Sequence, residues 1–249
     1  MTDTLYGPDL ALVQDRGFAG HADLTAPGVL ALLDGVRARG GLVHEIGCGS
    51  GALTRHLVEA GHRVVASDAS PALLDLARAR LPGVDVRRIR LPDDPLPPAD
   101  AVVGVGHALN YLPDAGAIRR ALAALVSSLR PDGVLAIDLC DLGFAAGKDE
   151  APFARVEDDW TIVTRFSSPA PELFVRDITT FVRDGDGRWR RSDERHTSAL
   201  LDVRVVPAWL AEHGVDAEVR PAFGAEALPR GLAAVVGVKR PGTTASPGR

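Results

Sequence analysis

The chain has 249 residues, of which 46% are hydrophobic and 24% are charged, and its formal net charge is −5. This length and apolar content are typical of one globular enzyme domain, and the acidic balance argues against nucleic acid as a partner. No apolar run approaches the ~18 residues of a membrane-spanning helix, and the first residues lack a signal-peptide pattern, so we expect a cytoplasmic protein without a membrane partner.

Helices and short apolar strands alternate through the first 141 residues. In chain order we predict helices over 8–15 and 26–38, a strand over 42–46, a helix over 52–60, a strand over 63–67, a helix over 71–80, strands over 84–89 and 101–105, a helix over 114–129 and a strand over 134–138. Short, nearly continuous apolar runs are typical of parallel strands that are buried on both faces. The pattern therefore predicts an α/β fold with a doubly wound, mostly parallel Rossmann-like sheet.

The pattern changes after residue 141. Residues 142–158 read as a loop, and 160–166, 173–183 and 189–198 read as antiparallel strands with a hairpin turn at 185–187. A short helix over 207–213 and a hairpin of 215–220 with 232–239 complete the chain. We therefore expect a single domain over 1–241: a helical cap (1–40), a cofactor-binding core (41–141), an antiparallel β insertion (155–200), a C-terminal helix and hairpin (205–241), and then a disordered tail (242–249).

The most informative segment runs from Gly41 to Gly51 and reads Gly-Leu-Val-His-Glu-Ile-Gly-Cys-Gly-Ser-Gly. An apolar run leads through Glu45 into a Gly-x-Gly-x-Gly turn, and the next apolar run ends in Asp68. Glycine adopts positive φ at little steric cost, and without Cβ atoms a ligand can lie against the backbone. A carboxylate at the end of the second strand can accept hydrogen bonds from ribose hydroxyls. This order of elements predicts a nucleoside site.

Two classes of cofactor compete for the turn, because Gly47, Gly49 and Ala52 also fit the dinucleotide fingerprint. Glu45 distinguishes them. Its carboxylate points toward the place where a pyrophosphate would lie, and two like charges in a low-dielectric cleft repel each other. A ligand with positive charge and no phosphate is favoured, and S-adenosylmethionine has a sulfonium, an ammonium and no phosphate.

These segments resemble the class I S-adenosylmethionine-dependent methyltransferases of small molecules. Residues 43–51 resemble the first motif of that family, 63–77 the ribose-binding motif, 99–112 the fourth strand with the loop of the methyl-transfer site, and 129–138 the fifth strand. The resemblance implies S-adenosyl-L-methionine as the cofactor, bound by Glu45, Gly47, Cys48, Gly49, Gly51, Asp68, Ala69, Arg90, Leu91 and Gly106. Arg90 stands where the family often has an acid or a small polar residue. Because a guanidinium cannot accept a hydrogen bond, we expect a backbone carbonyl or Asp93 to meet the adenine amino group.

Methyl transfer mainly requires an aligned nucleophile and the exclusion of water, and a hydroxyl or ammonium nucleophile must also lose a proton. His107 is the leading candidate for the general base, because it follows the fourth strand at the edge where open α/β sheets bind ligands. Tyr111 is the second catalytic candidate. Tyr6, Phe18, Asn110 and His196 are the candidates for contacts with the substrate.

The two cysteines, Cys48 and Cys140, do not suggest a disulfide framework, and no His/Cys/Asp/Glu cluster has metal-ligand spacing, so we expect no metal. The sequence indicates a transferase (EC 2.1.1.-) that methylates an oxygen or nitrogen of a small-molecule metabolite as a monomer or homodimer. The alternatives are a protein methyltransferase and a catalytically silent cofactor-binding scaffold, followed by an NAD-dependent oxidoreductase.

Overall fold

The computed structural model describes residues 5–148 and 151–241, and its core is a seven-stranded mixed sheet. The strand order is β10-β11-β5-β4-β1-β2-β3. The strands are β1 (Leu42–Ile46), β2 (Arg63–Asp68), β3 (Asp85–Arg88), β4 (Ala99–Gly104), β5 (Leu129–Cys140), β10 (Val215–Arg220) and β11 (Leu232–Lys239). The five strands from β1 to β5 pair in parallel, and β11 pairs antiparallel with both β5 and β10. The predicted doubly wound sheet with a C-terminal hairpin is confirmed.

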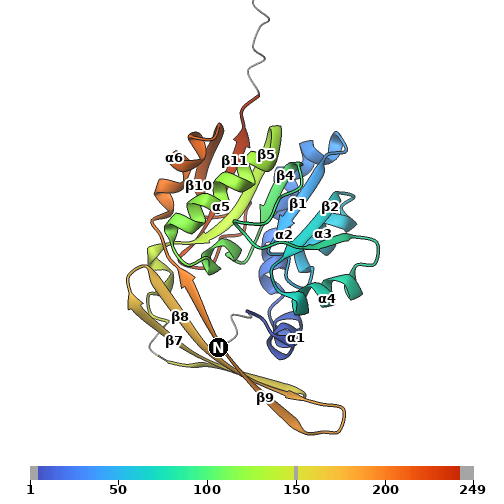
Figure 1. The fold of residues 1–249 in the computed structure, drawn as a ribbon, viewed down its shortest axis with the longest axis vertical. Helices are drawn as coiled ribbons and strands as arrows, with labels where there is room; N and C mark the ends of the chain where they lie inside the picture. Colours follow the sequence, from blue (N-terminus) through green and yellow to red (C-terminus); the bar gives the residue numbers. More distant parts are fainter. Residues whose placement is uncertain (1–4, 149–150, 242–249) are drawn as a thin grey trace, which may run out of the picture.

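Helices cover both faces of this sheet (Figure 1). They are α1 (Pro8–Gly17), α2 (Gly20–Ala38), α3 (Ala52–Glu59), α4 (Pro71–Arg80), α5 (Ala115–Ser128) and α6 (Val206–Ala211), with 3₁₀ turns η1 (Ala108–Tyr111), η2 (Leu142–Ala145) and η3 (Val203–Val205). On one face Leu122 and Leu125 of α5 are fully buried against the sheet, and on the other Val29 and Leu33 of α2 are fully buried. None of the helices in the described ranges is long and apolar enough to cross a membrane.

A second, antiparallel sheet lies below the first in Figure 1. It has the order β6-β7-β8-β9, with β6 (Phe153–Val156), β7 (Trp160–Ala170), β8 (Leu173–Arg183) and β9 (Trp189–Ala199). Trp160, Ile162 and Ile178 of this sheet pack on Leu10 and Val13 of α1. The small sheet therefore buries part of its apolar surface against the N-terminal cap, while Phe174 of β8 packs with Cys140 and Phe144 of the main domain.

Two segments differ from the sequence prediction, and a third lies outside the described residues. The helix expected over 26–38 begins earlier, at Gly20, and continues through Pro27. The expected loop over 142–158 contains η2 and the edge strand β6, whose four residues are too short to give a readable alternation. The expected disordered tail, 242–249, lies outside the described residues.

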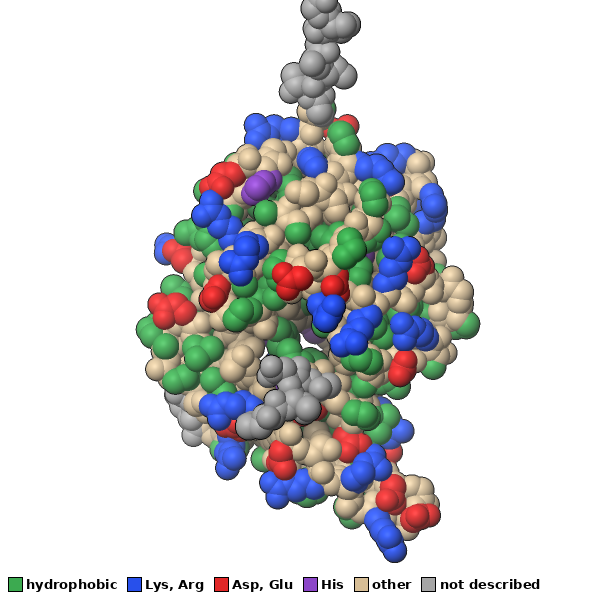
Figure 2. Space-filling view, in the orientation of Figure 1, with side chains coloured by type: hydrophobic (Ala, Val, Ile, Leu, Met, Phe, Trp, Pro, Cys, Tyr) green, Lys and Arg blue, Asp and Glu red, His purple; other side chains and the backbone are tan. Residues whose placement is uncertain are grey.

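The surface is hollowed between the large sheet and the small one (Figure 2). The hollow lies beyond the carboxyl ends of β1, β2 and β4, since the glycine turn, Asp68 and Gly106 all line the cavity found there. Open α/β sheets bind ligands at this edge.

Candidate functional site

The glycine turn between β1 and α3 needs its glycines for two different reasons. Gly47 has φ of +60°, and a Cβ atom on it would lie 2.3 Å from the Cβ of Ala108. Gly49 has φ of +55°, but a Cβ atom there would meet nothing within 4 Å. Gly47 thus permits the close approach of η1, whereas Gly49 leaves open space on the side of the cavity.

Asp68, at the end of β2, is fixed by the backbone around it. Its Oδ2 accepts a hydrogen bond from the Gly49 N–H at 3.0 Å, and its Oδ1 accepts one from the Ser70 N–H at 2.8 Å. Burial raises the pKa of this carboxyl above its ordinary value, and the two N–H donors oppose that shift. Each carboxylate oxygen keeps a further lone pair, so Asp68 can still accept hydrogen bonds from the hydroxyls of a ribose.

Glu45 is an acid inside the protein, with 2% of its surface exposed. Its Oε2 accepts a hydrogen bond of 2.6 Å from the hydroxyl of Thr54 on α3. Burial raises the pKa of Glu45 from 4.5 to about 8, and the nearby Asp68 adds to the shift. Without a ligand this carboxyl is therefore mostly neutral at pH 7, and a cation bound beside it would favour its ionised form.

These groups line one cavity of about 450 Å³, which is within the usual range for small-molecule sites. Nine of the ten residues expected at the cofactor line it: Glu45, Gly47, Cys48, Gly49, Asp68, Ala69, Arg90, Leu91 and Gly106. Gly51 does not line it, because it faces α4, where a Cβ atom would lie 2.8 Å from Leu81 Cδ1. Tyr6, Phe18 and Tyr111 also line the cavity.

At the expected adenine end, the guanidinium of Arg90 is engaged by Asp94. Its Nε and Nη2 each lie 3.1 Å from a carboxylate oxygen of Asp94, which also accepts the backbone N–H of Arg90. Asp93 is not among the lining residues. A backbone carbonyl as the partner of the adenine amino group stays a prediction.

His107 lies beside the cavity rather than among its lining residues. Its ring stacks on Tyr111 with centroids 5.7 Å apart, and its buried Nδ1 has no hydrogen-bond partner in the described part of the chain. Burial, with the charge of Arg176 adding, lowers the pKa of His107 to about 3. The imidazole is thus neutral at pH 7 but a weak base.

Asn110 and His196 support the cavity from behind. The side chain of Asn110 is fully buried; its Nδ2 donates to the carbonyl of Ala199 at 2.5 Å and its Oδ1 accepts the N–H of Cys140 at 2.9 Å. The buried His196 has its Nε2 2.8 Å from a carboxylate oxygen of Glu194. Neither residue is among those that line the cavity, and both have structural partners, so their expected substrate contacts stay a prediction.

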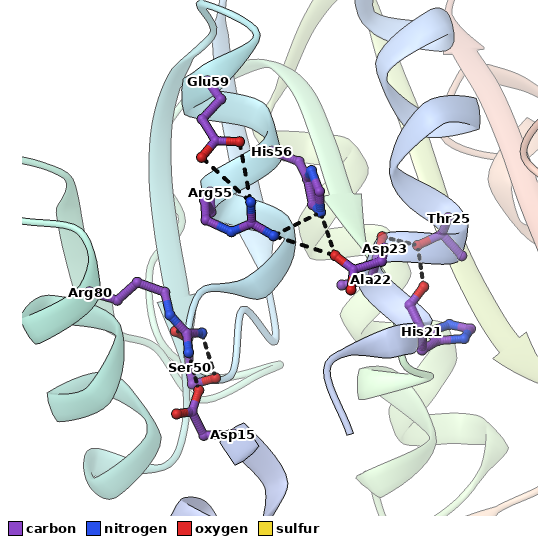
Figure 3. Close-up of polar contacts among 10 residues, drawn as sticks. All are labelled: Asp15, His21, Ala22, Asp23, Thr25, Ser50, Arg55, His56, Glu59 and Arg80. Atoms are coloured by element: carbon purple, nitrogen blue, oxygen red, sulfur yellow. Dashed lines mark hydrogen bonds and ion pairs between the residues drawn. The ribbon is translucent and has the colours of Figure 1, made fainter. Parts of the chain in front are cut away.

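His21 is a lining residue that sequence reasoning missed. Its Nε2 lies 2.7 Å from Oδ2 of Asp138, which is buried at the end of β5 and also accepts the N–H groups of Gly106 and His107. The hydroxyl of Thr25 donates to the carbonyl of His21, one turn earlier in α2 (Figure 3). His21 and Asp138 are 117 residues apart, so no local pattern joins them. The only signal in the sequence was Asp138 itself, an acid near the carboxyl end of a buried strand.

Polar contacts hold the N-terminal helices over the cavity (Figure 3). Arg80 of α4 donates to the carbonyl and hydroxyl of Ser50 in the glycine turn and also to Asp15 of α1. On the other side, Nε2 of His56 in α3 lies 2.7 Å from Oδ1 of Asp23 in α2. The cap is therefore tied to the same turn that lines the cavity. Among the described residues, no group of three or more His, Cys, Asp or Glu side chains converges as a metal site.

Residues 43–133 match the methyltransferase-domain family, a range that contains the glycine turn, Asp68 and Gly106. A provisionally named methyltransferase of Geobacillus sp. strain WCH70 is 25% identical over 185 residues, which are 68% of this chain and 72% of the relative.

The fold is similar to that of an S-adenosylmethionine-dependent methyltransferase from Clostridium acetobutylicum, with a TM-score of 0.78, 15% identity, and coverage of 92% of this chain and 97% of that one. It is also similar to the sugar N-methyltransferase KedS8 from Streptoalloteichus, with a TM-score of 0.76 and 24% identity. The match covers 96% of this chain and 98% of KedS8.

The residues fit S-adenosylmethionine. The open approach at Gly49 accommodates a nucleoside, Asp68 retains acceptors for a ribose, and Glu45 is a buried carboxyl that a cation would stabilise. Residues 43–133 therefore form a methyltransferase domain, and the chain has the fold of the class I S-adenosylmethionine-dependent methyltransferases.

Proposed function

We propose that this methyltransferase acts on an oxygen or nitrogen of a small-molecule metabolite. The observation that carries the proposal is the enclosure of one cavity by the cofactor residues and by side chains of the cap. Glu45, Gly49 and Asp68 line it from the large sheet, while Tyr6 and Phe18 line it from the N-terminal segment.

This enclosure favours a small acceptor over a protein. Phe18 lies 6.1 Å from Phe153 of β6, centroid to centroid, and the guanidinium of Arg155 donates to the carbonyl of Gly17. The small sheet and the cap therefore close on each other beside the cavity. A protein substrate needs an open groove that can admit a loop or terminus, and such a wall would obstruct it.

When bound, S-adenosylmethionine supplies an electrophilic methyl group. The protein has to position the acceptor, exclude water and hold the proton that a hydroxyl or ammonium acceptor loses. His21 is suited to hold it, because a histidine whose Nε2–H is donated to a carboxylate presents Nδ1 as its proton acceptor. Asp138 would then stabilise the imidazolium that forms, as a buried carboxylate does in other histidine-based sites.

His107 is the competing proton acceptor. Its place after β4 was expected from the sequence, but burial lowers the pKa of His107 to about 3, which makes it a weak base at neutral pH. Protonating it beside Arg176 would place two positive charges close together, whereas His21 has a carboxylate as its partner. The geometry therefore favours His21, with His107 as the alternative.

The first acceptors to test are amino sugars, since KedS8 is named as a sugar N-methyltransferase. At 24% identity that likeness supports the fold alone, so the panel should also include hydroxylated and amino metabolites without a sugar. Transfer of labelled methyl from S-adenosylmethionine to the panel is the readout. Isolated peptides and proteins complete the panel as representatives of the alternative acceptor class.

Three variants identify the base: His21→Ala, His107→Ala and, as a control, His213→Ala, whose side chain is exposed beyond α6. We expect His21→Ala to reduce turnover by about 10²–10⁴-fold, the usual contribution of a positioned base. The affinity for S-adenosylhomocysteine should remain unchanged, and His213→Ala should behave as the wild type. Loss of turnover only in His107→Ala would reassign the base.

Two results would overturn the proposed function. Binding of S-adenosylhomocysteine without methyl transfer to any acceptor in the panel would favour a silent scaffold. Thermal stabilisation by NAD(H) and not by S-adenosylhomocysteine would favour an oxidoreductase, because a ligand stabilises the fold it binds.

A further inference from the structure

Behind the tyrosines of the cavity lies Arg176, a residue that the proposed function does not yet use. It stands on β8, and its Nη2 donates to the hydroxyl of Tyr111. The hydroxyl oxygens of Tyr111 and Tyr6 are 2.6 Å apart, and both tyrosines line the cavity. Arg176 is partly exposed but is not among the residues that line the cavity, and its buried Nε has no hydrogen-bond partner in the described part of the chain.

The charge of Arg176 is not balanced within the described ranges. No carboxylate there lies within ion-pair distance of its guanidinium, whereas Arg190, Arg191 and Arg195 of the neighbouring β9 each pair with an aspartate. Burial raises the pKa of Tyr6 well above its ordinary value, so that hydroxyl stays neutral and gives no compensation.

Glu194, an acid that contacts the backbone of Tyr6, already has other partners. The carboxylate of Glu194 accepts the backbone N–H of Tyr6 at 2.8 Å and that of Gly7 at 2.9 Å, and it also meets Nε2 of His196. It holds the start of the cap in place. Its hydrogen bonds are therefore used to position Tyr6 rather than to neutralise Arg176.

A second cation lies in the same surroundings. The Nζ of Lys148 is 3.0 Å from the centroid of the Phe144 ring, and this ring packs 5.5 Å from that of His107. Burial lowers the pKa of Lys148 to about 8, and the charge of Arg176 contributes to the shift. Two basic side chains thus lie near each other, and neither is paired with a carboxylate among the described residues.

A guanidinium held away from water without a counter-charge is costly, and the cost is removed when an anion binds it. Arginine offers five N–H donors in a planar fork that matches carboxylate and phosphate oxygens. Only one of these N–H groups has a described partner, the Tyr111 hydroxyl. If Tyr111 donates in turn to Tyr6, the proton of Tyr6 is left to donate to a ligand.

We propose that Arg176, together with the hydroxyls of Tyr6 and Tyr111, binds an anionic group of the methyl acceptor, a phosphate or a carboxylate. The inference rests on the proposed function, because it places this anion on the same molecule as the nucleophile. The acceptor then spans the cavity, with its nucleophile near His21 and Gly106 and its anionic group against the tyrosine pair. Neutral metabolites would bind more weakly than their phosphorylated or carboxylated relatives.

The test uses the full chain loaded with S-adenosylhomocysteine. Inorganic phosphate and acetate are titrated calorimetrically against it, with sodium chloride at matched ionic strength as the reference. The phosphate and acetate arms distinguish the two kinds of anion. The variants are Arg176→Gln and the control Arg165→Gln. Arg165 is an exposed arginine on β7. Its neighbour Phe166 stands opposite Arg176 in the strand register, so Arg165 points to the other face of the sheet.

We expect the wild type and Arg165→Gln to bind phosphate, acetate or both, and Arg176→Gln to bind that anion at least tenfold more weakly. The melting temperature of Arg176→Gln in sodium chloride should equal or exceed that of the wild type, because the substitution removes an uncompensated charge. No binding of either anion by the wild type, or equal binding by Arg176→Gln, overturns the inference. A lower melting temperature of Arg176→Gln in sodium chloride overturns it as well.

The two proposals fail separately. Binding of S-adenosylhomocysteine together with methyl transfer to a neutral acceptor, but without anion binding, would remove the anion site and leave the proposed function intact. Absence of methyl transfer to every acceptor would remove the proposed function, whatever the anions do.

Discussion

Replacing Glu45 by Gln separates the cost of burying a carboxyl from its use in binding a cation. Gln keeps an oxygen that can accept the hydroxyl of Thr54, which now donates to Oε2 of Glu45 at 2.6 Å. Burial raises the pKa of Glu45 from 4.5 to about 8 in the folded protein. The unfolded chain ionises near 4.5, so folding must hold a proton on this side chain at neutral pH.

The sign and size of the effect on stability follow from this shift. A carboxyl with a raised folded pKa contributes its full stability below pH 4.5 and loses it as the pH rises to about 8. Each pH unit across that window costs 1.36 kcal/mol, so at pH 7.5 the cofactor-free wild type should be about 4 kcal/mol less stable than Glu45→Gln. At pH 5 the difference should be about 1 kcal/mol.

Urea unfolding of both proteins without cofactor, at several pH values from 5 to 8, measures this difference. Other titrating groups are common to both proteins and cancel. Glu59→Gln is the matched control, since Glu59 is an exposed carboxylate on α3. A stability difference between wild type and Glu45→Gln that does not change with pH would refute the reasoning.

The Glu45→Gln substitution should weaken cofactor binding, although it should raise the stability of the cofactor-free protein. A bound cation favours the ionised form of Glu45, so below pH 8 the wild type should release a proton when it binds S-adenosylmethionine. Calorimetry in buffers of different ionisation enthalpy measures that proton. Glu45→Gln should release none and should bind S-adenosylmethionine about 10–100-fold more weakly, the usual range for a lost charged hydrogen bond.

Three further substitutions test the other parts of the site. Asp68→Ala should weaken S-adenosylmethionine and S-adenosylhomocysteine by equal factors of about 10 or more in calorimetric titration, because both share the ribose; unchanged affinity would remove the ribose assignment. Gly47→Val should lower the melting temperature and abolish cofactor binding, since even its Cβ would lie 2.3 Å from that of Ala108; wild-type binding would contradict the close approach. Asn110→Ala should lower the free energy of unfolding by about 2–4 kcal/mol, because it leaves the buried N–H of Cys140 and the carbonyl of Ala199 unpaired. A loss of turnover without a loss of stability would instead support the substrate contact first expected for Asn110.

The parts of the fold that could be predicted are those written in contiguous residues. The apolar runs of β1, β2, β4 and β5 are short and continuous, which only a sheet buried on both faces explains. The turn from Gly47 to Gly51 and the acid at Asp68 follow from the same local pattern. The cofactor cavity was predictable for this reason, because adjacent parallel strands bring their carboxyl ends to one edge.

The acceptor side was less predictable because its contacts join distant segments. His21 reaches Asp138, and Arg176 reaches Tyr111, across separations of 117 and 65 residues that no local pattern records. Asn110 shows the converse. Its place after β4 suggested a substrate contact, but its amide is fully used in tying η1 to β5 and β9. A polar side chain near a site is free for a ligand only to the extent that the surrounding backbone leaves its donors and acceptors unused.

The central claim is that the cavity at the strand ends holds the cofactor, with its ribose at Asp68 and its cationic end near Glu45. A crystal structure of the protein grown with S-adenosylhomocysteine tests it most directly. The ribose hydroxyls should lie within hydrogen-bond distance of the Asp68 carboxylate, and the amino acid moiety should lie on the Glu45 side of the glycine turn. A nucleoside bound elsewhere, or one whose ribose does not touch Asp68, would contradict it.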